Sequence, residues 1–259
     1  MYGAAVSQLR ELEIADVQDL LSDLSSSFGE SDLLWYRGQA RADWKLQPSL
    51  ARREGLGMEL ELFAEFKRDA TPLLAGADLR GGDLSEWDWL FLMQHYGIPT
   101  RLLDWSESPL SAVFFALDET GITAPVGDAC VWLLKPQELN RAARLTITQP
   151  WFVPLCGESV EADYYLPSQV PIGSRNLEPM AISATRRFDR IRAQTGVFTV
   201  MHRDPMPLEE SAPHALVRYV IPHAAKDGIR KQLRRLNLHA STMYPDLEHL
   251  GRRIAELLS

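Results

Sequence analysis

Short runs of β-prone apolar residues alternate with amphipathic helical segments along the whole chain of 259 residues. The strand-like runs are rich in valine, leucine and aromatic residues and lie at residues 33–36, 100–105, 129–134, 196–200 and 216–221. The helical segments repeat apolar side chains at helical spacing and lie at residues 8–28, 57–70, 84–96, 110–117, 224–236 and 246–258. No internal repeat, low-complexity tract or linker separates them. The pattern therefore predicts one mixed α+β domain.

The charge balance and the cysteine count limit the class of protein. The 27 basic and 35 acidic residues give a net charge of −8, which argues against a broadly basic nucleic-acid-binding protein but leaves room for a local basic patch. Two cysteines, Cys130 and Cys156, are too few for a disulfide scaffold or a cysteine-rich zinc module. The histidines are scattered and no H-E-x-x-H occurs, so we expect no metal site. No secretory leader or membrane-spanning stretch is visible, which predicts a cytoplasmic protein with no membrane partner.

Arg37 and Gly38 follow the aromatic run of residues 33–36, so we expect them at the end of a buried strand. A guanidinium there is a fixed fork of donors that suits a phosphate or a carboxylate, and the glycine lets a ligand approach the backbone. An arginine paired with an acidic neighbour, followed by a turn glycine, explains the same two residues. The residues alone leave both interpretations open.

The densest polar cluster lies in residues 94–106, where an imidazole, a phenol, a guanidinium and a carboxylate stand among apolar residues. Partly desolvated groups of these kinds are candidates for perturbed pKa values and hence for a functional site. The alternative is a helix C-cap followed by a buried Arg101–Asp104 ion pair that holds a turn together. Gln194, a polar amide before a β-prone run, is similarly either a member of a hydrogen-bond network or a ligand contact.

Several common catalytic and nucleotide-binding motifs do not occur. The sequence has no G-x-S-x-G of a serine hydrolase, no G-x-G-x-x-G and no P-loop, so we expect no glycine-rich loop for a dinucleotide or ATP. Two basic clusters, residues 186–192 and 226–235, are able to contact nucleic acid, although a solvated helix face is the commoner explanation. The proline-rich residues 145–182 have no clear period and predict loops with short strands over the functional face.

Several segments together resemble the FRG domain family. Residues 35–39 (WYRGQ) resemble the aromatic-Arg-Gly motif that gives the family its name, with Tyr36 at the aromatic position. The resemblance continues in the same order through residues 94–105, 112–116, 190–199 and 233–247. On this resemblance, residues 30–259 are the FRG domain and residues 1–29 are an N-terminal helix packed on it.

A more distant resemblance is to ADP-ribosyltransferases of the arginine–serine–glutamate type. Three motifs in the same order carry it: Arg37-Gly38, then Thr100 or Ser106 before residues 112–116, then Gln194 before the strand at 196–200. This resemblance implies an ADP-ribosyltransferase-like split β-sheet flanked by helices. It also implies NAD as the substrate.

The same resemblance implies roles for individual residues. Arg37 would hold the pyrophosphate or a ribose of NAD, the Gly38 backbone would hold the nicotinamide amide, and Gln194 would lie by the nicotinamide ribose. In those ADP-ribosyltransferases a glutamate or a glutamine opens the late strand, and this chain has Gln194 at that place. A neutral amide stabilises an oxocarbenium-like state less than a carboxylate does, so Asp104 is a candidate for the missing charge.

These segments give the predicted site and function. The candidate catalytic residues are Arg37, Gln194 and Asp104. The candidate ligand-binding residues are Tyr36, Gly38, His95, Tyr96, Thr100, Arg101, Trp105, Ser106 and Phe198. The leading hypothesis is NAD or nucleotide binding, with ADP-ribose transfer to a protein or nucleic-acid acceptor or NAD hydrolysis, in a bacterial toxin or anti-phage effector. The alternatives are a non-catalytic ligand- or partner-sensing module and a nucleic-acid-binding protein that uses the basic clusters.

Overall fold

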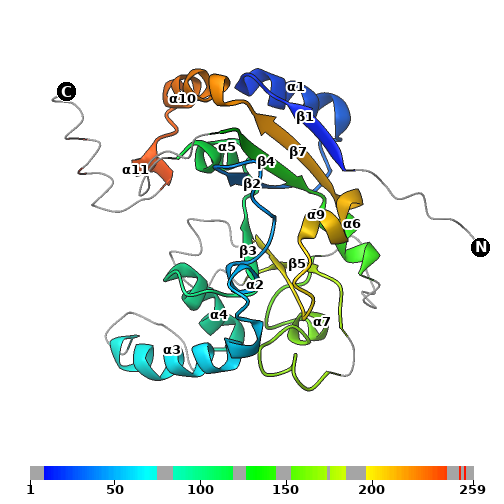
Figure 1. Cartoon of the computed structure of the whole chain (residues 1–259), viewed down its shortest axis with the longest axis vertical. Coiled ribbons are helices and arrows are strands. Elements are labelled where there is room, and N and C mark those ends of the chain that lie inside the picture. The colour runs from blue at the N-terminus through cyan, green and yellow to red at the C-terminus, as the bar shows by residue number, and fades with distance from the viewer. Residues whose placement is uncertain are drawn as a thin grey trace, which may run out of the picture. The chain divides into compact units, whose positions relative to one another are not determined.

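The computed structural model describes residues 9–74, 84–118, 127–143, 153–173, 176–184, 197–243, 251 and 254. Its elements belong to two compact units, each assembled from distant parts of the chain (Figure 1). Unit 1 comprises residues 1–44, 105–135 and 213–259, and unit 2 comprises residues 45–104 and 136–212.

Unit 1 is built on a four-stranded sheet in the order β1-β7-β4-β2. Its strands are β1 (Arg10–Glu13), β2 (Trp35–Gln39), β4 (Ala129–Leu134) and β7 (Leu216–Ile221). β7 pairs with β1 in parallel and with β4 antiparallel, and β4 pairs antiparallel with β2. Every residue of β4 is buried, which accounts for its unbroken apolar sequence.

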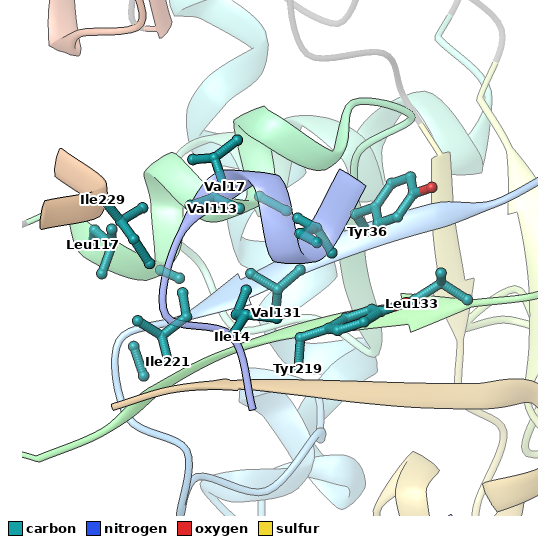
Figure 2. Packing of buried hydrophobic residues seen from close by; sticks show 14 of the residues in the cluster. Ile14, Val17, Tyr36, Val113, Leu117, Val131, Leu133, Tyr219, Ile221 and Ile229 are labelled. Carbon is teal, nitrogen blue, oxygen red and sulfur yellow. The ribbon is translucent and has the colours of Figure 1, made fainter. Parts of the chain in front are cut away.

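Helices cover one face of this sheet. They are α1 (Val17–Ser27), α5 (Pro109–Leu117) and α10 (Lys226–Arg235), and the short turns η2 (Pro213–Ala215), η3 (His223–Ala225) and α11 (Ala240–Met243) connect or follow them. Side chains from the three helices meet alternate side chains of the strands in one apolar cluster (Figure 2). Its labelled members include Val17, Val113, Val131, Tyr219 and Ile229. Burial of this cluster holds the helices on the sheet.

Unit 2 is built on a three-stranded sheet in the order β3-β6-β5. Its strands are β3 (Leu102–Trp105), of which Trp105 is counted in unit 1, β5 (Met180–Ser183) and β6 (Val197–Val200). Its helices are α2 (Ser49–Arg52), α3 (Glu59–Leu74), α4 (Glu86–His95), α6 (Pro136–Ala142), α7 (Val160–Asp163) and α9 (Leu208–Ser211), with the turn η1 (Leu56–Met58) before α3. Trp87, Phe91 and Phe198 stack in the core of this unit.

The structure confirms the mixed α+β class and corrects two local predictions. The helix predicted over residues 8–28 begins only at Val17, because Asp16 caps it and residues 10–13 pair with β7 as a strand instead. Arg37 and Gly38 lie inside β2 rather than at its end, because the ladder with β4 continues to Gln39.

Other predictions fall outside the described residues. These are Gln194, the basic cluster at 186–192, most of the helix at 246–258 and the first part of the proline-rich stretch. The later part of that stretch contains the short strand β5 among turns, as predicted, and also the short helix α7, which the sequence did not predict. The ADP-ribosyltransferase-like arrangement of the sheets and the domain boundary at residue 30 stay predictions.

Candidate functional site

β2 places Arg37 and Gly38 on opposite faces of the four-stranded sheet, since successive residues of a strand alternate. Gly38 faces α5. A β-carbon added to it would lie 2.0 Å from the carbonyl oxygen of Ala112 and 2.5 Å from the amide nitrogen of Ala116. The backbone of α5 therefore sits directly on the glycine, and a larger residue would push the helix away.

The outer edge of β2, the edge away from β4, offers a backbone donor and acceptor. Tyr36 and Ser106 exchange two backbone hydrogen bonds of 2.7 Å on this edge. Because successive residues of a strand direct their N–H and C=O groups to alternate edges, both groups of Gly38 point to the same edge as those of Tyr36. Within the described part of the chain, nothing hydrogen-bonds to these two groups of Gly38.

Arg37 lies on the opposite face, in a row of paired residues that crosses the sheet. The row runs Arg37, Trp132, Arg218, Glu11. The guanidinium carbon of Arg218 lies 5.5 Å from the centre of the Trp132 ring, and its Nε donates to Glu11 over 2.6 Å. The Trp132 indole N–H donates to Gln39 over 2.8 Å. A buried indole is thus flanked by two arginines, of which Arg218 is paired with a carboxylate.

The other predicted site residues of unit 1 are partly or fully buried. Tyr36 is 5% exposed and its ring belongs to the apolar cluster under α5; burial raises its pKa to about 12, so the phenol is neutral. Trp105 is 4% exposed. The Ser106 side chain accepts a hydrogen bond of 3.1 Å from the backbone N–H of Ser108, the N-cap of α5. Ser106 therefore links the β2 edge to the start of α5.

Arg101 forms a buried ion pair in unit 2. Its Nε donates to Glu59 over 2.6 Å and a second nitrogen donates to the other carboxylate oxygen. A third nitrogen donates to the backbone carbonyls of Met201 and His202, at 3.3 and 3.2 Å. Both side chains of the pair are 3% exposed. The guanidinium is thus committed to interactions within the fold, and its partner is Glu59 rather than the Asp104 considered from the sequence.

His202 is buried beside that ion pair. Its Nδ1 lies 3.2 Å from the backbone N–H of Leu177, which donates to it. Burial, together with the charges of Arg101 and Arg203, lowers the pKa of His202 to about 4. The ring is therefore neutral at physiological pH.

Gln94 connects two residues that the sequence singled out. Its Nε2 donates to Asp104 over 2.6 Å, and its Oε1 accepts from the hydroxyl of Thr100. The Thr100 oxygen in turn accepts from the backbone N–H of Leu102 over 3.2 Å, so its proton is directed at the amide. This chain fixes the orientation of the Gln94 amide and holds the exposed Asp104 carboxylate on an otherwise buried strand.

The remaining predicted residues of unit 2 differ in solvent exposure. His95 and Tyr96 are exposed at the end of α4, with their rings edge to face and 5.0 Å apart. Tyr96 also approaches Phe66 of α3, at 6.4 Å between ring centres. Phe198 is buried and stacks on Phe91 at 4.9 Å, so its ring contributes to the core.

Comparison with known proteins gives one family. Residues 32–122 match the FRG domain family model. The chain carries an FRG domain. No curated protein and no solved structure matches the chain. The match covers β2, the polar cluster of residues 94–106 and α5, and it does not extend to the later segments in which the sequence suggested the same resemblance.

The FRG match includes residues of both units. Within unit 1 the structure brings Tyr36, Gly38 and Ser106 together at the β2 edge, with Arg37 next along the strand. Within unit 2 it joins Thr100 and Asp104 through Gln94 and buries Arg101 in the fold. The assignments of all these residues as catalytic or ligand-binding stay predictions, and Gln194 lies outside the described residues.

Sequence reasoning did not find three of the groups that organise these sites. Glu59 stands 42 residues before Arg101, and no local signal marks it as the partner. Trp132 lies outside the FRG match, in a strand that pairs with the FRG motif. Gln94 lies in the polar cluster, but only the fold shows that its amide bridges Thr100 and Asp104.

Among the residues that the structure describes, no group of three or more histidine, cysteine or acidic side chains is placed to hold a metal ion. Over the same residues, the helices are too short or too polar to cross a membrane.

Proposed function

We propose that the FRG domain binds the nicotinamide carboxamide of NAD at the outer edge of β2. The observation that carries this proposal is the orientation of the Gly38 N–H and C=O groups, which follows from the Tyr36–Ser106 pair. A primary carboxamide has one acceptor and one donor side by side. It therefore pairs with the donor and acceptor of a single strand residue as a neighbouring strand would.

Gly38 packs on α5 through one face of the sheet, whereas a carboxamide would bind to it from the edge of the sheet. The α5 backbone lies above the plane of the sheet, whereas the Gly38 N–H and C=O lie in that plane. The close helix contact fixes the position of the strand residue that would bind the ligand. Such a rigid support suits a recognition site, because little conformational entropy is lost on binding.

Arg37 supplies the positive charge that a dinucleotide requires. It is the neighbour of Gly38 and stands in register with Trp132 on the other face of the sheet. A guanidinium binds phosphate oxygens or ribose hydroxyls through fixed N–H donors. We assign it the pyrophosphate or a ribose of NAD, as the resemblance to ADP-ribosyltransferases implies.

Calorimetric titration tests the binding proposal. NAD should bind the wild type saturably, and the analogue with a carboxylate in place of the carboxamide should bind at least about ten-fold more weakly, because it cannot donate to the Gly38 carbonyl. Arg37→Ala should lose NAD binding with little change in melting temperature.

Arg218→Ala is the matched control, since Arg218 lies on the other side of the same tryptophan, in the same row of paired residues. It should retain NAD binding. Equal affinity for the amide and acid forms would reject the Gly38 edge as the carboxamide site. Absence of NAD binding to the folded wild type would reject the proposed function.

The resemblance extends the proposal to cleavage of the bond between nicotinamide and ribose. Such cleavage passes through an oxocarbenium-like state, which a carboxylate stabilises better than the amide of Gln194. Nicotinamide release by the wild type, lost in Arg37→Ala, would support transfer or hydrolysis of ADP-ribose. Saturable binding without release would leave a nucleotide-sensing module. Growth arrest on expression of the wild type but not of Arg37→Ala is the outcome that a toxin role predicts.

A further inference from the structure

α10 presents a basic face to solvent. Its ten residues include five lysines and arginines and one aspartate, in a chain whose net charge is −8. Ile229 and Leu233 lie in the core of unit 1 and are 0% and 2% exposed, which fixes the rotation of the helix (Figure 2 labels Ile229). The outward side then carries three exposed cations, called here the basic face: Lys231, Arg234 and Arg235.

The basic face is separate from the cations that the fold uses. Arg230 donates to Asp227 over 2.7 Å and to the carbonyl of Leu117 over 3.2 Å. The buried Lys226 donates to the carbonyl of Ala40 over 3.3 Å. The three cations of the basic face, by contrast, make no hydrogen bond or ion pair with any residue that the structure describes. Their charges are therefore available to a partner.

The start of α1, which contacts α10, does not neutralise the basic face. Gln232 of α10 accepts from the backbone N–H of Val17 over 2.9 Å, so the start of α1 lies beside α10. The carboxylates there cap α1: Asp16 accepts from the N–H of Asp19 over 2.9 Å, and Asp19 accepts from the N–H of Ala15 over 2.8 Å. These acidic groups stabilise the positive end of the α1 dipole.

We infer that the basic face of α10 is a binding surface for the phosphate backbone of nucleic acid. Lys231 and Arg235 are one helical turn apart, about 6 Å along the axis, and Arg234 lies between them. Guanidinium groups suit phosphate oxygens, which they bind through two parallel N–H donors. The partner chemistry is thus a chain of closely spaced phosphates, read without sequence specificity.

Other partners fit the same surface less well. A membrane surface would need either an apolar face to insert or a cluster of at least about four cations, whereas Ile229 and Leu233 are buried in the core and the basic face has three cations. A stable protein interface has an apolar centre ringed by polar groups, whereas the basic face carries three cations with only Leu236, 53% exposed, at its end. Nucleic acid needs neither feature.

Salt-dependent binding tests the inference. Fluorescence anisotropy with a labelled oligothymidylate, and with a duplex of the same length, should show binding at low salt that weakens as KCl rises. Three phosphate contacts predict that log K falls against log [KCl] with a slope of roughly −2 for the single strand and roughly −3 for the duplex. The double variant Lys231→Gln/Arg235→Gln should reduce the steepness by roughly 1.4 for the single strand and roughly 1.8 for the duplex.

Arg52→Gln/Arg53→Gln is the charge-matched control, because both arginines are exposed and both lie in unit 2. It should bind as the wild type does. Equal weakening by the two double variants would assign the effect to net charge and overturn the inference. Absence of binding at low salt, or equally effective competition by polyglutamate, would also overturn it, the latter in favour of an acidic polypeptide.

Discussion

Gly38 has a structural role that its sequence context does not reveal. In the sequence, Gly38 follows Arg37 after a run of aromatic residues, and this pattern predicts a position where a ligand approaches the backbone. In the fold, the α5 backbone takes the space of its missing side chain, while its N–H and C=O point to the β2 edge. One residue type therefore meets two requirements, and replacing it disturbs the packing before it disturbs any ligand.

Gly38→Ala should destabilise the protein by about 3 kcal/mol, because the added carbon would overlap the backbone of Ala112 and Ala116 and α5 would have to move. Chemical denaturation measures the free energy of unfolding. Gly228→Ala is the control: it lies on α10, nothing is within 4 Å of its added carbon, and it should raise stability by up to about 1 kcal/mol. Equal stability of Gly38→Ala and wild type would contradict the close packing of α5 on β2.

Arg101 differs from Gly38, because the sequence predicts that it binds a ligand whereas the structure gives its guanidinium partners within the fold. Its guanidinium binds Glu59 and two backbone carbonyls, and both partners of the ion pair are buried. A buried pair of this kind is costly to break, because a lone charge would remain in a low-dielectric site. Its geometry therefore favours a positioning role in unit 2 over direct contact with a ligand.

At the scale of elements, the start of α1 shows how a cap competes with periodicity. Apolar residues at helical spacing suggest a helix from residue 8, yet residues 10–13 add to the sheet as a strand beside β7. The helix begins after Asp16, whose side chain accepts from the N–H of Asp19, while the Asp19 side chain accepts from the N–H of Asp16. Short-range hydrogen bonds thus decide the boundary that the apolar pattern leaves open.

Asp16→Ala should reduce the free energy of unfolding by about 1 kcal/mol, because it removes the acceptor for a helix N-terminal N–H group. Ser22→Ala, at an exposed position on the same helix, should leave stability unchanged or raise it slightly. Thermal unfolding of both variants measures the difference. If the two variants melted at the same temperature, the capping box would not determine the start of α1.

At the scale of the whole molecule, acid sensitivity should depend on His202. Its pKa is lowered from 6.5 to about 4 in the folded protein. Between these two pH values the unfolded state binds a proton that the folded state does not bind. The free energy of unfolding should therefore fall as pH falls through this window, and this contribution should level off below pH 4.

His202→Asn tests this linkage, since an asparagine oxygen is able to accept from the backbone N–H of Leu177. The variant should show a smaller slope of stability against pH between 6.5 and 4, by up to one proton, or about 1.4 kcal/mol per pH unit. Denaturation at a series of pH values gives both slopes. Identical slopes would mean that His202 does not carry the acid sensitivity.

The residues of the FRG match are divided between the two units, and each unit combines them with segments from elsewhere in the chain. Residues 32–122 supply β2 and α5 to unit 1 and the polar cluster to unit 2. The strand that pairs with β2 is β4, which lies beyond the match. The family motif is therefore built into a sheet whose other strands come from outside it.

The sequence alone determined the α+β class, most strands and helices, and the FRG motif, because apolar periodicity and short motifs are local properties of the chain. Tertiary structure decided the strand order, the contact between Gly38 and α5, the Glu59 partner of Arg101 and the Gln94 bridge to Asp104. These features join residues that are far apart in sequence or on different elements. Their energies come from packing and hydrogen bonds that exist only once the chain has folded, so no local pattern encodes them.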